Sequence, residues 1–218
     1  MPSEQIENYL KNIYKLQTSE GKVTTTSLSK NLNISPASVS EMIKKLADEG
    51  TLMHTPYKGV ELTEEGKKLA LRIIRKHRLW EMFLVQVLHF KWDEIDHEAE
   101  KFEHIMSDKM EEKIDHVLGH PLIDPHGDPI PTKDGEIICS MSFPLTDATE
   151  GSLVQVLRVS DSNSELLQYV SSIGIALHKK ISVLQKRNFD NSMVIKVDDQ
   201  EVNISSIVAK SIFVETVG

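Results

Sequence analysis

Apolar side chains recur at helical intervals through the first ninety residues of the chain. Residues 4–17 repeat them every three or four positions, which predicts an amphipathic helix. A shorter helix of the same kind is predicted over 24–31, followed by a turn at 33–34. Ser35 is a good N-cap and Pro36 suits the first helical position, so another helix is expected to begin there and to end at Gly50.

The hydrophobic pattern then changes period twice. Residues 51–62 alternate like two short strands around 57–59, which predicts a hairpin. Thr63 is expected to cap a long helix that reaches about residue 88, and another long helix is predicted over about 93–117. Residues 119–135 are rich in proline and glycine and read as an irregular linker. Beyond residue 150 the segments alternate like strands, with helical patches at 164–172 and near 204–209. The predicted fold is mainly α with a small C-terminal β domain.

Composition narrows the class of protein. The 218 residues are 39% apolar and 27% charged, which suits a globular chain. No apolar run approaches the roughly 18–20 residues of a membrane span, and the N-terminus lacks the basic and apolar regions of a secretory signal. The single cysteine, Cys139, excludes a disulfide framework and a cysteine-rich metal site. We therefore expect a cytoplasmic protein without a membrane partner.

Charge is distributed unevenly. Residues 1–80 hold 13 Lys and Arg against 9 Asp and Glu, a net of +4, whereas the remaining residues hold 12 against 24, a net of −12. Seven of the nine histidines lie between His77 and His126. This pattern indicates nucleic acid as a partner of the first part and cations as ligands of the second, although such fluctuations also occur by chance.

The predicted order over 24–62 is short helix, tight turn, second helix and hairpin, the winged helix-turn-helix arrangement. The start of its second helix would meet base edges in the major groove, where small residues allow close approach and lysines contact phosphates. Similar geometry also occurs in modules that bind proteins. The candidate DNA-contacting residues are Thr26, Ser35, Pro36, Ala37, Ser38, Ser40, Lys44, Lys45 and Lys58.

Acidic and imidazole side chains form a second constellation. Glu100, Glu103 and His104 share one helix face, with no basic residue between them on that face, so a divalent cation is the simplest neutraliser. Asn8 could add a carbonyl oxygen. His77 and Glu81 form another i, i+4 pair, expected to be half-buried. Asp124, His126 and Asp161 are further donors. His97 shares the face of Glu100 and His104, either as an extra ligand or as a group outside the ligands. Oxygen and nitrogen donors without thiolate suit Mn(II) or Fe(II), and Zn(II) can bind such sites in vitro.

The chain resembles the diphtheria-toxin-repressor family of metal-dependent transcriptional regulators, and within it the manganese-responsive branch that keeps a C-terminal SH3-like domain. The resemblance covers nearly the whole chain and rests on the stretches ISPASVSEMIKKL, YKGVELTEEGKKLA, RKHRLWEMFLVQVL, HEAEKFEHIMSDKMEEKID and HPLIDPHGDPIP. It implies a homodimer with a winged-helix domain at 1–75, a helical dimerisation and metal-binding domain at 76–140 and an SH3-like, FeoA-type barrel at 150–218.

The resemblance also assigns roles by position. Asn8, Glu100, Glu103 and His104 match a primary, activating site in which Asn8 replaces an aspartate. An ancillary site is matched by His77, Glu81, Asp124, His126 and Asp161. Asp96 stands where several relatives have a histidine ligand, with His97 beside it. Lys11 replaces a glutamate of two-domain members, which argues against their binuclear arrangement.

The function this implies is that of a repressor, not an enzyme, which binds operator DNA when loaded with metal and controls metal uptake genes. One alternative is a metal-dependent hydrolase with an attached DNA-binding domain, although the chain has no HExxH, G-x-S-x-G or P-loop motif. Another is a sensor of an organic ligand, which would need an apolar pocket; we expect no small organic substrate. A helical scaffold that does not bind DNA is the third.

Overall fold

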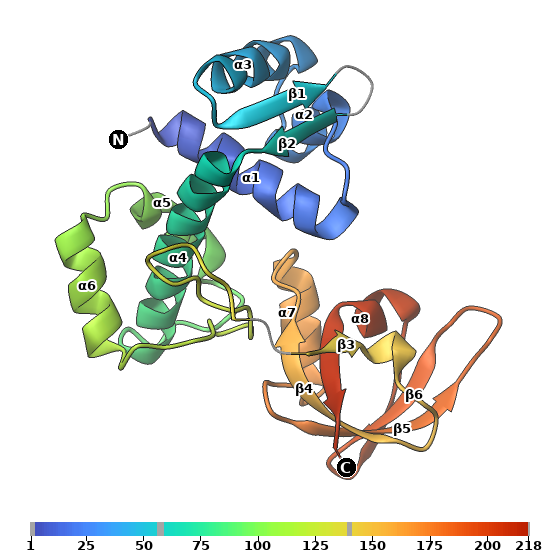
Figure 1. Ribbon diagram of the computed structural model, residues 1–218. Coiled ribbons are helices and arrows are strands. Elements are labelled where there is room, and N and C mark those ends of the chain that lie inside the picture. Colours follow the sequence, from blue (N-terminus) through green and yellow to red (C-terminus); the bar gives the residue numbers. More distant parts are fainter. Residues whose placement is uncertain (1–2, 56–58, 139–140, 218) are drawn as a thin grey trace.

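The computed structural model describes residues 3–55, 59–138 and 141–217. Its helices and strands follow one another in three successive parts (Figure 1). The N-terminal part and the helix that leaves it comprise α1 (Glu4–Glu20), α2 (Thr25–Leu32), α3 (Pro36–Asp48), β1 (Leu52–Thr55), β2 (Gly59–Leu62) and α4 (Glu64–Gln86). The middle part adds α5 (Asp96–Glu103) and α6 (Asp108–Val117). The last part comprises β3 (Phe143–Pro144), η1 (Leu145–Asp147), β4 (Leu153–Val159), α7 (Ser164–Ser172), β5 (Lys180–Lys186), β6 (Met193–Val197), β7 (Gln200–Ile204), α8 (Ser206–Lys210) and β8 (Ile212–Thr216).

The N-terminal part confirms the predicted winged helix-turn-helix. Thr24 and Ser27 form a reciprocal capping box at the start of α2, and the Ser35 hydroxyl accepts from the backbone N–H of Ser38 at the start of α3. β1 and β2 pair antiparallel, with Leu52 opposite Leu62. One apolar core joins α1, α2, α3 and the hairpin, so the helix expected to read DNA and the first helix of the chain belong to one packed unit.

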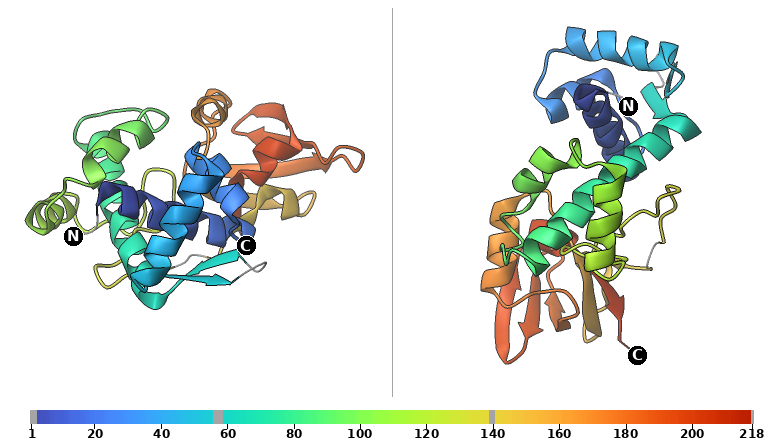
Figure 2. Two further views of the ribbon diagram at one scale, coloured as in Figure 1. Left: turned by 90° about the horizontal axis from the view of Figure 1, so that it is seen from above. Right: turned by 90° about the vertical axis from the view of Figure 1, so that its left-hand side faces the viewer.

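α4 connects the N-terminal part to the rest of the chain. It begins at the Thr63 cap, beside the hairpin, and runs without interruption across the boundary predicted between residues 75 and 76. Figure 2 shows that it extends from the winged-helix part towards the C-terminal sheet. Its middle and C-terminal turns bury His77 and Glu81. A change near these residues can therefore be transmitted along one rigid element to the hairpin.

The single long helix predicted over 93–117 is wrong. The chain forms α5 and α6 there, separated by a break at 104–107. Ser107 causes the second helix to start afresh, because its extended backbone and its hydroxyl, which accepts from Met110 N–H, form an N-cap. His104 lies at the C-terminal end of α5 and keeps a helical backbone, so it still shares a face with Glu100.

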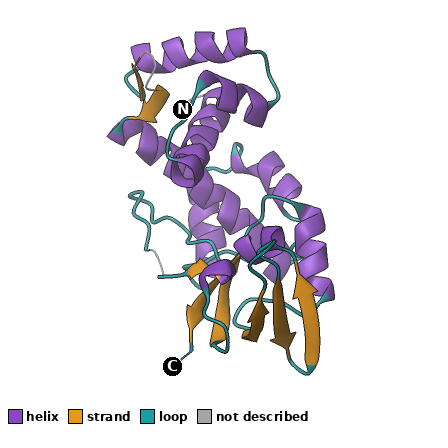
Figure 3. Cartoon of the chain, turned by 90° about the vertical axis from the view of Figure 1, so that its right-hand side faces the viewer, coloured by secondary structure: helices purple, strands orange, loops and turns teal. Residues whose placement is uncertain are grey.

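The C-terminal part is a six-stranded antiparallel sheet in the order β3-β8-β4-β5-β6-β7, with α7 and α8 packed against it (Figure 3). This confirms the predicted small β domain. The sheet begins at Phe143, before the expected start at residue 150. β7 was not predicted, because its side chains are mostly exposed and lack a clear apolar alternation.

The irregular segment 119–135 is held against this sheet. Val159 N–H on β4 donates to the carbonyl of His126 at 2.9 Å, and Trp92 Nε1–H donates to Ser171 Oγ at 2.7 Å. An ion pair of 3.6 Å joins Arg158 to Asp128. None of the described helices has both the length and the hydropathy needed to cross a membrane.

Candidate metal centre

A group of acidic and imidazole side chains, buried except for Asp96, lies where α4, the start of α5 and the 119–135 segment meet. We call it the Glu81 cluster, and its members are His77, Glu81, Asp96, Asp124 and His126. Glu81 belongs to two triads, one with His77 and Asp96 and one with Asp124 and His126. In each triad one ligand atom per residue lies within 4.8 Å of the others. Two further side chains therefore join the Glu81 carboxylate in each triad, and together they come from α4, the start of α5 and the 119–135 segment.

The prediction that His77 and Glu81 are half-buried is wrong, since they are 3% and 1% exposed. α5 and the 119–135 segment close over this face of α4. Both carboxylate oxygens of Glu81, Nε2 of His77 and Nδ1 of His126 are buried without a hydrogen-bond partner in the described part of the chain. Burying such groups unsatisfied is costly, whereas a cation would satisfy all four atoms at once. The donor set therefore fits a divalent metal ion.

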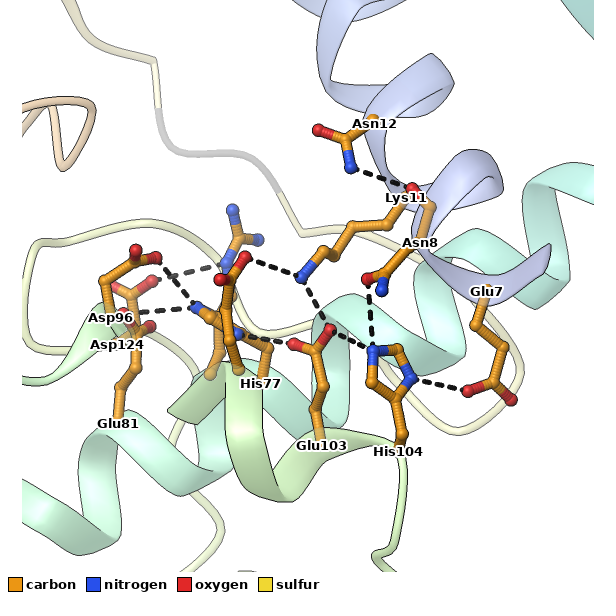
Figure 4. A network of polar contacts seen from close by, with 12 residues as sticks. Glu7, Asn8, Lys11, Asn12, His77, Glu81, Asp96, Glu103, His104 and Asp124 are labelled. Atoms are coloured by element: carbon orange, nitrogen blue, oxygen red, sulfur yellow. Dashed lines mark hydrogen bonds and ion pairs between the residues drawn. The ribbon is translucent and has the colours of Figure 1, made fainter. Parts of the chain in front are cut away.

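Each histidine of the centre is held by a contact to one ring nitrogen, and Figure 4 shows this for His77 and His104. His77 Nδ1 contacts Glu103 Oε2 at 2.6 Å, His126 Nε2 contacts the Trp92 carbonyl at 2.7 Å, and His104 Nδ1 contacts Glu7 Oε2 at 2.7 Å. Carboxylates and carbonyls accept, so these nitrogens carry the protons. In the neutral ring the opposite nitrogen then holds a lone pair, which is how metal-binding histidines are oriented.

The Glu81 cluster also perturbs proton binding. Burial lowers the pKa of His77, but Glu81, Asp96 and Glu103 outweigh it and hold that pKa well above its ordinary value. Burial, with the charges of Glu81 and Asp128, raises the pKa of Asp124 to about 7. The close contact with His77, whose Nε2 lies 3.3 Å from Asp96 Oδ1, lowers the pKa of Asp96 to about 2. In the metal-free protein protons thus supply part of the missing positive charge.

A second group lies between α1 and α5. We call it the Glu103 cluster, and its members are Asn8, Lys11, Glu100, Glu103 and His104. His104 Nε2 lies 3.1 Å from Asn8 Oδ1 and 3.1 Å from Glu103 Oε1. The structure thus brings the predicted residues Asn8, Glu103 and His104 together. Their role as metal ligands stays a prediction.

The expectation that no basic residue lies between the acids of this face is wrong. Lys11 Nζ contacts Glu103 Oε1 at 2.6 Å and Glu100 Oε1 at 3.4 Å. The helical pattern of residues 97–104 could not reveal this cation, because it comes from α1. Burial raises the pKa of Glu103, but His77 and Lys11 more than offset it, so the pKa lies below its usual value.

Glu103 joins the two clusters. Its Oε1 faces Lys11 and His104, while its Oε2 accepts from His77 Nδ1, whose Nε2 belongs to the Glu81 cluster. Burial of the Glu103 side chain is complete at 0% exposure. A change of charge at either cluster therefore reaches the other through a single carboxylate and a single ring.

Two of the predicted ligands, His97 and Asp161, lie outside both clusters. α5 begins at Asp96, which turns that side chain toward His77 at 3.3 Å and leaves His97 exposed on the outer side. Asp96, rather than His97, is thus the member of the pair that faces the site. Asp161, just beyond β4, is not among the residues of either triad, and its role stays a prediction.

Other residues that build the centre carry no motif in the sequence. Arg78 Nε lies 3.2 Å from Asp124 Oδ2, and the other oxygen of Asp124 accepts from the backbone N–H groups of His126 and Asp128 at 2.9 Å each. Glu7, next to Asn8, fixes His104. A carboxylate one residue from a candidate ligand is a weak signal; the Trp92 carbonyl gives none.

The predicted DNA-reading side chains are presented to solvent. Ser35, Pro36, Ala37, Ser38, Ser40, Lys44 and Lys45 are exposed at the start and along the outer face of α3, and Thr26 is exposed on α2. Ser40 Oγ donates to the Pro36 carbonyl at 2.9 Å. Lys58 lies outside the described residues. The exposed face is thus small and polar at one end and basic farther along.

Three family models match the chain in succession. They are described as the iron dependent repressor N-terminal DNA binding domain over residues 1–60, the iron dependent repressor metal binding and dimerisation domain over 63–132, and the FeoA domain over 143–216. The three matches follow the three parts of the fold.

Solved structures and curated relatives agree with these matches. A "manganese-dependent transcriptional repressor complex with manganese" is 38% identical, with a TM-score of 0.91 over 97% of this chain and 100% of that one. ScaR with bound Cd2+ is 36% identical, with a TM-score of 0.86 over 99% and 100%. The iron-dependent repressor IdeR of Mycobacterium tuberculosis is 36% identical over 57% of this chain, which spans about half (54%) of that relative. The diphtheria toxin repressor of Corynebacterium glutamicum is 27% identical over 97% of this chain and 96% of that protein.

Proposed function

Because the chain belongs to the family of iron- and manganese-dependent transcriptional repressors, we propose that it represses metal uptake genes by binding operator DNA as a metal-loaded homodimer in the cytoplasm. The activating ion is Mn(II) in the first place and Fe(II) in the second. The Glu103 cluster is the primary, activating site, and the Glu81 cluster is the ancillary site.

One observation carries the proposal. The buried carboxylate oxygens of Glu81, Nε2 of His77 and Nδ1 of His126 have no hydrogen-bond partner within the described residues, and His77 is linked through Glu103 to Lys11 on α1. α1 is also part of the core that positions α3. A site built to hold a cation is thus mechanically connected to the element expected to read DNA.

The donor types favour manganese or iron. Both clusters offer carboxylate, amide and imidazole groups, and the only cysteine of the chain is Cys139. Hard oxygen donors with some imidazole suit Mn(II) and Fe(II), whereas sites selective for softer ions commonly use thiolates. Two similar structures are described as manganese-dependent repressors, and ScaR occurs with Zn2+ and Cd2+. Zn(II) is therefore expected to bind in vitro.

The residues of the centre divide the work between them. Glu7, Glu103 and the Trp92 carbonyl orient the three histidines, and Arg78 fixes Asp124. Asn8 connects α1 to His104 on α5. When bound, a divalent cation supplies the charge that holds these donors together. α1 is then fixed against the middle part, and the spacing of two recognition helices in a dimer is set near one turn of B-DNA, about 34 Å or a multiple.

The middle part offers a surface for the second copy. Large apolar side chains are exposed on it, as expected of a surface that dimerisation covers. They are Leu88, Phe90, Phe102, Ile105, Met110 and Val117. A mass measurement by light scattering is expected to give twice 24.7 kDa.

The test is a gel shift on DNA from upstream of the protein's own gene, with Mn(II), Fe(II), Zn(II) or a chelator. Coupling between metal and DNA of about 1–3 kcal/mol predicts a 5- to 150-fold gain in affinity with Mn(II). Glu103→Gln keeps the shape of the side chain and is expected to abolish this gain. Glu98→Gln on the same helix, where Glu98 pairs only with Lys101 among the described contacts, is the matched control.

Equal DNA affinity with Mn(II) and with chelator would contradict the proposal. The alternative of a metal-dependent hydrolase has no support in the comparisons, and turnover assays with Mn(II) would be its separate test.

A further inference from the structure

Among the residues that the structure describes, Lys11 is the largest fully buried side chain, at 2% exposure. A lysine ammonium normally remains in water, because moving it into the interior removes its hydration. Here the four-carbon stem lies in the α1–α5 contact and directs the ammonium at the Glu103 cluster (Figure 4). The position is therefore determined by the acids it meets.

The Lys11 ammonium contacts the same carboxylates that a metal ion in the Glu103 cluster would bind. Nζ lies 2.6 Å from Glu103 Oε1, and this same oxygen lies 3.1 Å from His104 Nε2. The half-exposed Glu100 contributes a third group at 3.4 Å. Thus Lys11 contacts two of the four proposed ligands, Glu100 and Glu103, and a third, His104, contacts the same Glu103 oxygen.

The Glu81 cluster differs in this respect. Both oxygens of Glu81 have no hydrogen-bond partner within the described residues, although Glu81 is as deeply buried as Glu103. The charge of Glu103 is thus compensated by the Lys11 ammonium. Glu81 instead faces His77 Nε2 at 3.5 Å and His126 Nδ1 at 3.8 Å. The two sites differ in what a metal ion must remove before it binds.

We propose that the Lys11 ammonium is a tethered competitor that occupies the Glu103 cluster in the metal-free protein, so that a divalent cation must displace it to bind there. This inference rests on the proposed metal-dependent function. Two positive charges cannot share Glu103 Oε1 at contact distance in a poorly solvated site without strong repulsion. The flexible stem of the lysine allows the ammonium to withdraw from the cluster toward solvent.

Two consequences follow. The Glu81 cluster fills first as the metal concentration rises, and the Glu103 cluster fills only at a higher concentration set by Lys11. Without metal, the long side chain of Lys11 connects α1 to Glu103. Once metal has displaced the ammonium, the shorter side chain of Asn8 would connect α1 to His104 through the ion. The threshold for DNA binding is thus a property of one residue outside the proposed ligand set.

The experiment compares Glu81→Gln with Glu81→Gln/Lys11→Met by calorimetric titration of the chelator-treated proteins with MnCl2, without DNA. Glu81→Gln disables the ancillary site, so the titration reports the Glu103 cluster. Methionine keeps the unbranched stem and removes the charge. We expect Mn(II) to bind the double variant at least about tenfold more tightly, since one buried like charge is gone.

Metal-free Lys11→Met leaves Glu103 without its ammonium and is expected to unfold at a lower temperature, with a larger rise on addition of MnCl2 than in the wild type. Lys76→Met is the matched control, because Lys76 is also buried but donates to the Met106 carbonyl at 2.7 Å. It is expected to lower the unfolding temperature without changing the rise. If Lys11→Met fails to fold, Lys11→Gln replaces it in both measurements.

Equal or weaker Mn(II) binding by the double variant would overturn the role of Lys11 and leave the proposed function standing. If neither protein of the titration binds Mn(II), the assignment of the Glu103 cluster is wrong, and the proposed function fails with it.

Discussion

At the scale of single residues, the centre is defined by which atoms hold protons. His77 and Asp124 both bind protons more tightly in the folded, metal-free protein than in the unfolded chain. A metal ion needs the same atoms without protons, so protons and metal compete for the Glu81 cluster. The metal-free fold and the metal-loaded fold therefore respond to pH in opposite directions.

The first prediction concerns the stability of the metal-free protein. A raised pKa stabilises the fold below the unfolded-state pKa and loses this contribution as pH rises through the folded-state pKa. For Asp124 the loss is complete near its pKa of about 7, and for His77 it continues above that pH. Differential scanning calorimetry with chelator should show the unfolding temperature falling from about pH 6 to about pH 8, by about 2–4 °C per kcal/mol lost.

The control is Glu81→Gln, because the Glu81 charge raises both pKa values. Its unfolding temperature is expected to vary much less over the same range. With saturating MnCl2 the wild-type temperature should instead rise with pH. A metal-free unfolding temperature that rises with pH would contradict the assignment of these protons.

Sequence spacing identified most of the residues of both clusters but not their chemistry. Intervals of three and four residues placed Glu100 beside Glu103 and His77 beside Glu81. The ammonium of Lys11 was missed as a member, because 92 positions separate it from Glu103 and only the packing of both α1 and α5 against α4 brings them together. Local periodicity carries no information about such contacts.

At the scale of elements, the 119–135 segment is the part of the centre with no regular structure to hold it. Asp124 ties the segment into a turn, and β4 pairs with it through Val159. Gly127 lies between these anchors with a φ of +92°, and a Cβ there would stand 2.0 Å from the Leu157 carbonyl oxygen. The close approach of the segment to β4 thus depends on a missing side chain.

The second prediction compares Gly127→Ala with Gly119→Ala. Both glycines have positive φ, but a Cβ at Gly119 meets nothing within 4 Å. Each alanine strains the backbone by about 1 kcal/mol. Only Gly127→Ala should also push the segment off β4, move Asp124 and His126, and weaken Mn(II) binding to the Glu81 cluster by about tenfold or more. Calorimetric titration of the two variants checks this; equal affinities would contradict it.

The elements themselves were mostly predictable, since caps and apolar intervals are local. Two elements departed from the prediction, each because of a local feature that the apolar intervals do not show. Ser107 divides one long amphipathic stretch into α5 and α6, and β7 has little apolar alternation because most of its side chains are exposed. The packing of the 119–135 segment against β4 depends on a distant strand, so the sequence indicated a linker where the structure has part of the site.

At the scale of the whole molecule, charge and architecture are aligned. The basic N-terminal part lies at one end and the C-terminal sheet at the other, with α4 between them (Figures 1 and 3). Most of the acidic excess lies in residues 81–142, with 15 Asp and Glu against 5 Lys and Arg, whereas residues 143–218 hold 9 against 7. Approach to DNA is therefore favoured for the end that carries α3. The order of the three parts was predictable from the resemblance, whereas the contacts of Trp92 and His126 with the last part were not.

The third prediction concerns the salt dependence of DNA binding. Lys44 and Lys45 are exposed on α3 and are expected to contact phosphates. Each contact removed lowers the slope of log affinity against log salt concentration by about 1. Lys44→Ala and Lys45→Ala should show this in fluorescence anisotropy with Mn(II), while exposed Lys210→Ala on α8 should not. An unchanged slope for both α3 variants would contradict the orientation of α3.

The two oxygens of Glu103 have a consequence for anyone who wishes to retune such a sensor. Exchanging Glu103 to alter ion preference at one site would also release His77 at the other, so the two sites cannot be redesigned separately through this residue. Asn8 and Asp96 each contact only one site and lie at its outer edge. They are the positions at which the set point could be shifted while the shared middle of the centre stays intact.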